Sequence, residues 1–301
     1  MLDKIEFLNE YKIKDAFLQS NLDWNTLESI YDDYSKYEIK LHENNINNKI
    51  VSYIKDGMNC NIHSINTRLK SQEHLIEKII RKRGIEQSYK YKPINKDNYK
   101  DIIKDLIGIR IITLSKEEWE GVHDWLISKF PDDNTQDIFM EETPQAYTRY
   151  GDRDIFKDKI LKEHTNKGYR SQHYIINFQG YYCEIQVRTL SEEVFGEFDH
   201  KVKYPYRNNN NFLIRYTNMV SQFLNSVDEM ISTCFQLKEQ GWDHCEGYYD
   251  NDNYIDWKNS AQTFTSVQNP PNLKNETKHN QINSQIDIAS YANSFILRKD
   301  E

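Results

Sequence analysis

The sequence predicts an α+β protein, with α/β architecture as the alternative. Apolar residues recur at helical spacing in several long segments, and short β-rich runs lie between them. These helix and strand signals follow one another in mixed order, without an internal repeat. With 301 residues and 38% apolar composition, the chain is large enough to bury a core, which argues against disorder of the whole chain.

Residues 1–56 are expected to form an N-terminal helical block. Apolar and aromatic residues recur there every three or four positions with charges between them, and Asp23 suits the position before a helix. The dipeptide Asp56-Gly57 ends the block. The residues that mark the helical face are Leu27, Ile30, Tyr31 and Tyr34.

Residues 57–206 are expected to form the main domain. Residues 60–70 are predicted to be extended, and a helix with an apolar face follows them and ends at Gly84. The later elements are predicted as a strand at 107–114, a helix at 116–130, a polar loop region at 131–170, and a hairpin of strands 174–178 and 182–189 that turns at Gln179-Gly180.

Residues 207–241 are expected to hold a C-terminal helix, from about 211 to 239, that packs on the main domain. Residues 242–301 are expected to form a polar, partly disordered tail, because Asn, Gln, Ser and Thr dominate and aliphatic residues are few. Apolar residues between 286 and 297 indicate a short terminal helix in this tail. The apolar stripe of the C-terminal helix consists of Phe212, Tyr216, Met219, Phe223, Val227 and Met230.

Composition and charge exclude several classes of protein. No run approaches the roughly 18 consecutive apolar residues of a membrane span, and the start lacks a signal segment, so a cytoplasmic protein without membrane contact is expected. The four cysteines include no CxxC pair, so neither a zinc site nor a disulfide framework is indicated. The net charge of −8 argues against a general nucleic-acid coat, whereas the Lys and Arg cluster between Arg68 and Lys104 suits a small polyanionic ligand.

An acid and an arginine mark the strand expected at 107–114. Asp105 stands before the apolar run and Arg110 lies inside it, where an unpaired guanidinium is costly, so we expect an anionic or aromatic partner for Arg110. Strict alternation puts the two side chains on opposite faces. Both can serve one site only if Asp105 precedes the regular strand or the strand bends, and a structural salt bridge is the alternative interpretation.

The segment Lys167-Gly168-Tyr169-Arg170-Ser171-Gln172-His173 has the composition of a nucleotide-binding loop. The glycine permits close backbone approach, the tyrosine ring offers a stacking surface for a base, and the cations suit phosphates. A plain lead-in to a hairpin is the alternative interpretation.

The strand expected at 182–189 has one polar face. Period two places Glu184, Gln186 and Arg188 on one side and apolar residues on the other, a pattern that is also typical of an antiparallel strand with a solvated face. A carboxylate from this strand and Asp105 from the other strand could converge on a hard divalent cation.

In order and spacing these segments resemble the synthetase domain of the RelA/SpoT family over roughly residues 20–206. The resemblance implies a nucleotidyltransferase-like, mixed and mostly antiparallel β-sheet flanked by helices. It also implies Mg²⁺-dependent transfer of pyrophosphate from ATP to the ribose 3′-hydroxyl of GDP or GTP, which makes AMP and (p)ppGpp, the stringent-response signal. The motifs that carry it are Arg68-Leu69-Lys70 with Lys78 downstream, the strand from Asp105 to Arg110, Gly168-Tyr169-Arg170-Ser171, the segment from Glu184 to Thr189, and Asp199-His200.

The resemblance implies a role for each matching residue. Asp105 and Glu184 are expected to bind Mg²⁺ and carry catalysis, with Glu184 deprotonating the acceptor hydroxyl, and Tyr169 is expected to stack on guanine. The implied ATP-binding residues are Arg68, Lys70, Lys78 and Arg110, and the implied acceptor-binding residues are Lys167, Tyr169, Arg170, His173, Gln186, Arg188 and His200.

Other acceptors and partners stay open. Some small family members resemble toxins that act on the 3′ end of tRNA or on adenine nucleotides. A basic groove leading to the site would favour tRNA, whereas a closed pocket around Tyr169 would favour GDP or GTP. A non-catalytic nucleotide sensor is the alternative from another class, and a homo-oligomer or an antitoxin partner is compatible with the resemblance to small stand-alone synthetases, which implies no alarmone hydrolase.

Overall fold

The chain divides into two compact units, Met1–His244 and Cys245–Glu301. The structure, a computed structural model, describes residues 2–165, 168–203 and 211–239, which all belong to the first unit. The polar tail expected at 242–301 and its short terminal helix lie outside the described residues.

The N-terminal region is helical, as its apolar spacing predicts. Leu27, Ile30 and Tyr34 are fully buried, whereas Tyr31 is partly buried. Asp23 does occupy the N-cap position of the longest of these helices, but its side chain forms no capping hydrogen bond. The helices are α1 (Lys4–Glu10), α2 (Lys14–Ser20), α3 (Trp24–Glu43) and α4 (Ile46–Lys55).

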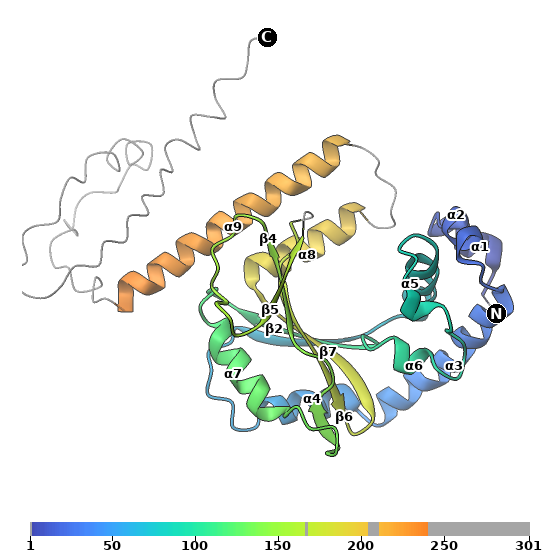
Figure 1. The fold of residues 1–301 in the computed structure, drawn as a ribbon, viewed down its shortest axis with the longest axis horizontal. Helices are drawn as coiled ribbons and strands as arrows, with labels where there is room; N and C mark the ends of the chain where they lie inside the picture. The colour runs from blue at the N-terminus through green and yellow to red at the C-terminus, as the bar shows by residue number, and fades with distance from the viewer. Residues whose placement is uncertain (1, 166–167, 204–210, 240–301) are drawn as a thin grey trace, which may run out of the picture. The chain divides into compact units, whose positions relative to one another are not determined.

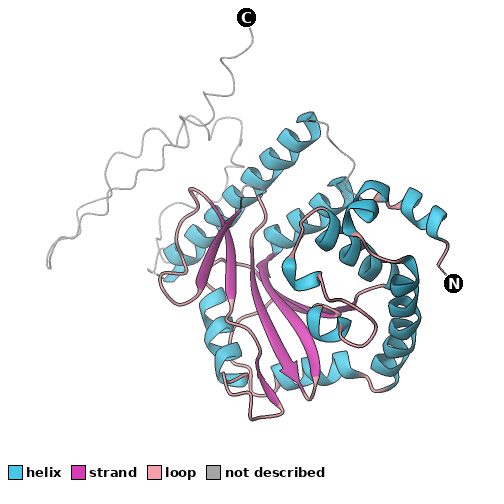
Figure 2. Ribbon diagram, turned by 45° about the vertical axis from the view of Figure 1, so that its right-hand side comes forward, coloured by secondary structure: helices cyan, strands magenta, loops and turns pink. Residues whose placement is uncertain are grey.

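One mixed β-sheet forms the centre of the described unit (Figure 2). Its strand order is β1-β2-β7-β6-β4-β5, with β3 paired to β6. The β2–β7 and β4–β5 pairs are parallel and the other pairs are antiparallel, which confirms the expected mixed sheet. The strands are β1 (Ser64–Leu69), β2 (Ile107–Thr113), β3 (Ile138–Met140), β4 (Gln145–Arg149), β5 (Leu161–Thr165), β6 (Ser171–Phe178) and β7 (Tyr181–Thr189).

The predicted hairpin is confirmed. Strands β6 and β7 are antiparallel neighbours, and the turn between them places Gln179 at φ 53° and Gly180 at φ 84°. Two successive residues with positive φ are typical of the tight turn that matches the twist of a β-hairpin.

The loop predicted for residues 131–170 is wrong in part, because this segment contains β3, β4 and β5. These strands are only three to five residues long, and β5 is mostly exposed. A short strand near the edge of a sheet can be polar, so its sequence lacks the apolar alternation that reveals a half-buried strand. Pairing with β6 decides the conformation of β3 and β4, and pairing with β4 decides that of β5.

The two faces of the sheet are covered differently. α4 and α7 (Trp119–Lys129) pack on one face, and α8 (Leu190–Lys203) lies on the other with α9 (Asn211–Glu239) beside it (Figure 1). Alternate residues of β2 and β7, including Ile109 and Ile185, join the core under α4 and α7. The opposite face of these strands is therefore left for polar side chains.

A second core joins the N-terminal helices to α5 (Gln72–Gly84). The apolar face predicted for α5, which includes Leu75 and Ile79, is fully buried, and the helix ends at Gly84 as predicted. An added Cβ at Gly84 would lie 2.0 Å from the backbone oxygen of Ala16, so α2 and α5 touch backbone to backbone. The short helices η1 (Tyr89–Tyr91) and α6 (Tyr99–Ile102) follow α5 and lead to β2.

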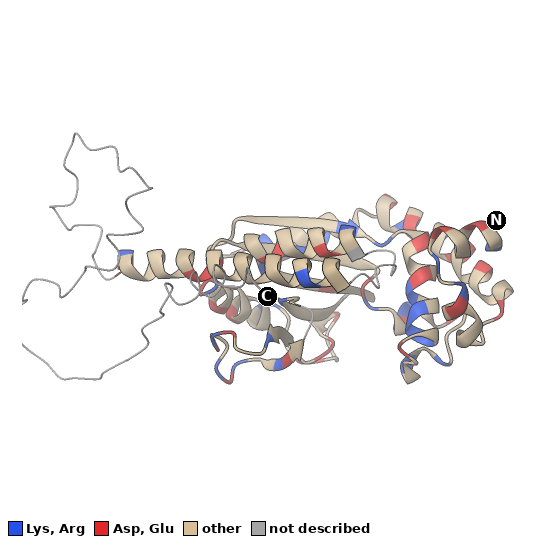
Figure 3. Cartoon of the chain, turned by 90° about the horizontal axis from the view of Figure 1, so that it is seen from above, with Lys and Arg blue, Asp and Glu red and all other residues tan. Residues whose placement is uncertain are grey.

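α9 spans the predicted residues but attaches through its polar side. Its buried residues are Thr217, Ser221, Asp228 and Ser232, while Phe212 and Phe223 of the apolar stripe are each 62% exposed. In Figure 3 this long helix is accordingly mostly tan, with few charged residues. The apolar stripe correctly predicts an amphipathic helix, but the stripe does not face the described unit.

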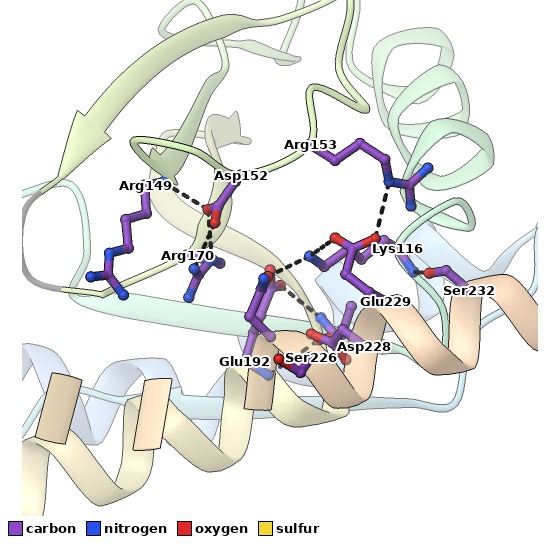
Figure 4. A network of polar contacts seen from close by, with 12 residues as sticks. Lys116, Arg149, Asp152, Arg153, Arg170, Glu192, Ser226, Asp228, Glu229 and Ser232 are labelled. Carbon is purple, nitrogen blue, oxygen red and sulfur yellow. Dashed lines mark hydrogen bonds and ion pairs between the residues drawn. The ribbon is translucent and has the colours of Figure 1, made fainter. Parts of the chain in front are cut away.

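A polar network holds α9 in place (Figure 4). The Thr189 hydroxyl donates a hydrogen bond to Asp228 at 2.7 Å, and the buried Lys116 ammonium lies 2.8 Å from the Glu229 carboxylate. Glu192 and Thr189 form a reciprocal cap at the start of α8, because each side chain accepts a hydrogen bond from the other's backbone N–H. Burial and the nearby charge of Asp228 raise the pKa of Glu192 to about 7.

Gly84→Ala should destabilise the protein by about 3 kcal/mol, near the upper end of the range for overpacking, because the new methyl group must push α2 away from α5. Urea unfolding followed by circular dichroism measures this change. Gly121→Ala is the control, since its Cβ would lie 3.3 Å from a side-chain atom of Cys60 and should cost less than about 1 kcal/mol. Equal effects of the two substitutions would contradict the backbone contact between the helices.

Glu192→Gln should make the protein more stable at pH 8, on the order of 1 kcal/mol, with little change at pH 5. The folded-state pKa is raised, so native Glu192 keeps its proton where the unfolded chain has lost it, and stability falls as pH rises from about 4.5 to 7. The amide oxygen of glutamine still accepts the hydrogen bond from Thr189. Thermal unfolding across this pH range tests the prediction, with Glu197→Gln as the control because the pKa of Glu197 is lowered. A uniform loss of stability at all pH values would overturn it.

Candidate active site

The polar face of β2 and β7 carries four of the predicted site residues, Arg110, Glu184, Gln186 and Arg188. In the parallel register of these strands Arg110 lies opposite Gln186, and Gly108 lies opposite Glu184. The next strand places His173 opposite Gln186. The neighbours on the other face, Cys183, Ile185 and Val187, are buried in the core, so the period-two prediction for this strand is confirmed.

Asp105 lies two residues before β2 begins at Ile107, which meets the condition for serving the same site as Arg110. Its Oδ2 accepts from the ammonium groups of Lys78 at 2.7 Å and Lys70 at 3.1 Å. Its Oδ1 is buried and has no hydrogen-bond partner among the described residues. Burial raises the pKa of Asp105, but the charges of Lys78 and then Lys70 outweigh burial and hold the pKa well below its ordinary value.

The two lysines reach Asp105 from different elements. Lys70 follows β1, and its backbone N–H donates to the carbonyl of Leu106 at 2.9 Å, which places it beside Asp105. Lys78 comes from α5. Burial lowers the pKa of Lys78, but the charge of Asp105, with a smaller effect of Glu184, raises it above the ordinary lysine value. Lys78 therefore lies under the influence of both predicted catalytic carboxylates.

A hydrogen-bonded chain runs from Glu184 to Tyr169. The Oε1 of Glu184 lies 3.1 Å from Nδ1 of His173, and Oε2 accepts from the amide of Gln186 at 2.6 Å. His173 Nε2 lies 2.9 Å from the Tyr169 hydroxyl. Burial raises the pKa of Glu184, but the hydrogen bond and charge of His173 leave it below its ordinary value, against a further upward effect of Asp105.

The donor set around Asp105 fits a hard divalent cation. Mg²⁺ binds carboxylate oxygens, usually through one or two protein carboxylates together with waters and substrate phosphates. The unpartnered Oδ1 of Asp105 is an available ligand, and Glu184 is a carboxylate whose pKa the charge of Asp105 raises. Within the described ranges no group of three or more His, Cys, Asp or Glu residues is arranged to hold a metal, so a site here would depend on oxygen atoms from the substrate.

Tyr169 is held by its neighbours in a fixed position. The Arg188 guanidinium lies 5.0 Å from the centre of its ring and donates to its hydroxyl, and the ring of Tyr147 lies 6.0 Å away at a steep angle. Gly168 precedes it at φ 76°, where an added Cβ would lie 2.6 Å from the Ser221 hydroxyl. Glycine is therefore required for the close approach of this loop to α9.

Arg170 contacts other residues than those of the chain from Glu184 through His173 to Tyr169. Its guanidinium pairs with both carboxylate oxygens of Asp152 at 2.7 Å, as Figure 4 shows. It also donates to the Ser221 hydroxyl at 2.9 Å and to the carbonyl of Gly168 at 3.2 Å, and only 8% of the residue is exposed. These contacts fix the loop that carries Tyr169, and contact of Arg170 with an acceptor stays a prediction.

Arg110, Arg68 and His200 are the remaining predicted residues that the structure describes. Arg110 has the anionic partners expected for it, because its Nη1 lies 2.5 Å from Glu193 and 2.6 Å from Glu197 of α8. Arg68 extends across Gly108, where an added Cβ would lie 3.2 Å from its side chain. The ring of His200 lies 6.1 Å from that of His74, and Lys167 lies outside the described residues.

Sequence reasoning missed the carboxylates that hold the arginines. Glu193 and Glu197 stand one helical turn apart on α8, directly after β7, and Asp152 lies in a segment taken for a loop. The sequence did contain a signal for Glu193 and Glu197. They are acids at i and i+4 on a helix that follows a strand containing arginine, so both lie on one helical face and can pair with an arginine.

Carboxylates neutralise most of the basic cluster between Arg68 and Lys104. Figure 3 accordingly shows blue and red residues interspersed on the N-terminal helices and α5. Besides Lys70 and Lys78, the paired cations include Arg81 with Glu77 and Glu86, Lys100 with Asp33, and Lys104 with Glu141 and Glu142.

In the part of the chain that the structure describes, no helix combines the length and apolar character required to cross a membrane.

Comparison with solved structures and sequences places the fold. The small alarmone synthetase 1 from Bacillus subtilis superposes with a TM-score of 0.51 at 18% identity, covering 69% of this chain and 99% of that one. The same synthetase bound to its product pppGpp gives 0.46 at 18% identity, with coverages of 70% and 95%. A GTP pyrophosphokinase family protein from Streptococcus pneumoniae gives 0.43 at 19% identity, with coverages of 74% and 96%. No curated protein sequence matches the chain.

The nucleotidyltransferase-like α+β fold is thus shared with the first of these synthetases. A family model described as the region found in RelA / SpoT proteins matches residues 67–209, and this region contains every predicted site residue from Arg68 to His200. Residues 67–209 of this chain therefore carry the region found in RelA / SpoT proteins.

Proposed function

We infer that this chain transfers a pyrophosphate group from ATP to the ribose 3′-hydroxyl of GDP or GTP, with Mg²⁺ as cofactor, and so makes AMP and (p)ppGpp. The observations that carry this proposal are the pairing of Asp105 with Lys70 and Lys78 and the hydrogen-bonded chain of Glu184, His173 and Tyr169, all inside the RelA/SpoT region. Two carboxylates and two lysines are groups that a polyphosphate and its metal ion require. A nucleotide sensor has no need of the carboxylate pair, so we prefer an enzyme.

Glu184 is the base in this proposal. Its carboxylate takes the proton of the acceptor 3′-hydroxyl while that oxygen bonds to the β-phosphorus of ATP. The bond between this phosphorus and the oxygen that bridges it to the α-phosphate breaks, and AMP leaves with that oxygen. Hydrogen bonds with His173 at 3.1 Å and Gln186 at 2.6 Å hold the Glu184 carboxylate in one orientation.

Asp105, Lys70 and Lys78 serve the phosphates of ATP. Mg²⁺ held by Asp105 and Glu184 would neutralise negative charge on the phosphate oxygens. Lys70 and Lys78 approach the same Oδ2 of Asp105, so their ammonium groups are close enough together to contact one polyphosphate. Both cations are partly shielded from solvent, with 14% and 17% of their side chains exposed, which strengthens their effect on the phosphates.

A guanine mononucleotide is the acceptor in this proposal, rather than tRNA. The described part of the basic cluster is mostly paired with acids, whereas a long nucleic-acid backbone needs a run of free cations. Tyr169 supplies a ring for stacking close to the base Glu184, to which His173 links it. We place the reaction in the cytoplasm, where both nucleotides are available.

Purified protein incubated with ATP, Mg²⁺ and GDP or GTP should release AMP and form a nucleotide carrying a 3′-pyrophosphate. Glu184→Gln should lower turnover about 10²- to 10⁴-fold, because the amide cannot accept the proton. Asp105→Asn should cause a loss of similar size, since it removes the charge that faces Lys70 and Lys78. Chromatography of the released AMP measures the turnover of the wild type and of both variants, and mass spectrometry identifies the second product.

Glu163→Gln is the control for these variants, because Glu163 is exposed on β5 and should leave turnover unchanged. Chelation of Mg²⁺ should stop the wild-type reaction. Near-normal AMP release by Glu184→Gln and Asp105→Asn would refute the assignment of both carboxylates. If product forms only with an adenine nucleotide or tRNA, the acceptor in this proposal is wrong, but the transfer of pyrophosphate from ATP is supported.

Tyr169→Ala should raise the KM for GDP about 10- to 100-fold, which corresponds to the loss of one stacked base, while the KM for ATP changes less than about twofold. Tyr169→Phe is the matched control, because it keeps the ring and loses the contacts of the hydroxyl, including those with His173 and Arg188. Steady-state kinetics with each substrate varied in turn makes the comparison. A phenylalanine variant as impaired as the alanine variant would argue against stacking.

A further inference from the structure

Glu193 connects the two halves of the polar face. One carboxylate oxygen lies 2.5 Å from Nη1 of Arg110 on β2, and the other lies 2.9 Å from Nη1 of Arg188 on β7. The side chain of Glu193 is only 16% exposed, so solvent screens these contacts weakly. A single carboxylate thus joins two arginines on neighbouring strands.

The position of Glu193 is fixed by the start of α8. The helix begins at Leu190, directly after β7 ends at Thr189, and the reciprocal cap between Thr189 and Glu192 sets its first turn. Glu193 follows Glu192 in that turn. Its carboxylate therefore stands over the strands on a rigid element, which is the arrangement needed to hold two guanidinium groups at a fixed separation.

Arg188 carries the connection onward to the acceptor side. Its guanidinium donates to the Tyr169 hydroxyl and to Ser171 Oγ, the latter at 3.1 Å, and lies against the Tyr169 ring. Gly196 makes room for it, since an added Cβ would lie 2.7 Å from Nη1 of Arg188. Among the described residues Glu193 is the carboxylate that pairs with Arg188.

Arg110 lies on the other side of the connection and has a second partner. Glu197, one turn further along α8, lies 2.6 Å from the same Nη1, and its side chain is 50% exposed. Glu197 contacts Arg110 but has no ion pair with Arg188 in the described part of the chain. The two glutamates therefore differ in their partners, because Glu193 links Arg110 on β2 to Arg188 on β7 and Glu197 does not.

We propose that Glu193 is a positioning residue that couples the two nucleotide subsites, so that a nucleotide engaging Arg110 changes the affinity of the site around Tyr169 for the second nucleotide. The proposal rests on the proposed function, which gives Arg110 to ATP and Tyr169 to the acceptor. Any shift of Arg110 toward a ligand alters its pair with Glu193, and through it the guanidinium that supports the Tyr169 ring. By linkage the effect is reciprocal between the two ligands.

Calorimetric binding of GDP, with and without α,β-methylene ATP and Mg²⁺, tests the coupling in the whole chain. In the wild type the analogue should change the Kd of GDP at least about fivefold, the lower end of common allosteric couplings. In Glu193→Gln the factor should fall below about twofold, because glutamine has one acceptor oxygen and cannot pair with both arginines. Glu197→Gln should keep the wild-type factor, since it leaves the link to Arg188 intact.

A coupling factor that persists in Glu193→Gln, that is absent from the wild type, or that disappears equally in Glu197→Gln would overturn the proposal. Thermal unfolding checks that each variant is folded. If Glu193→Gln is unfolded, Glu193→Asp takes its place, because it keeps the charge but is too short to span both arginines, and it should lose the coupling as well. The binding measurement does not require turnover. If the wild type couples its two ligands but releases no AMP, the proposed reaction is wrong while the role of Glu193 in coupling holds.

Discussion

The buried carboxylate of Asp105, paired with Lys70 and Lys78, is the interaction on which the rest of the site depends. It joins three separate elements, the end of β1, α5 and the entry to β2. Removing one partner from such a cluster leaves an uncompensated charge in a poorly solvated place, so the three elements hold one another in position. The backbone contact between Gly84 and Ala16 contributes indirectly, because it fixes the helix from which Lys78 extends.

The fold could be predicted from the sequence where local pattern and tertiary position agree. The alternation of Cys183, Ile185 and Val187 reveals a strand with one buried face, and the spacing of Leu75 and Ile79 reveals a buried helical face. The site residues of β7 follow from the same alternation, since the polar positions must lie opposite the core. Asp105 was harder, because alternation applies only inside the strand that begins two residues later.

The failures have a common physical cause, which is that pairing between distant segments decides the outcome. The polar strand Leu161–Thr165 exists because it lies beside β4, and no apolar alternation marks it. The roles of Glu193 and Asp152 depend on which arginine each one meets, and spacing along the chain does not determine that. For α9 the amphipathic pattern was correct, but the helix meets the described unit through Ser221 and Asp228 and not through its apolar stripe.

This polar attachment has a thermodynamic consequence. Separation of α9 from Thr189 and Lys116 would hydrate hydroxyls, carboxylates and an ammonium, and because hydration of polar groups lowers the heat capacity, the accompanying increase in heat capacity would be smaller than for a purely apolar contact. Such an opening would set the exchange rates of the amide protons along this helix.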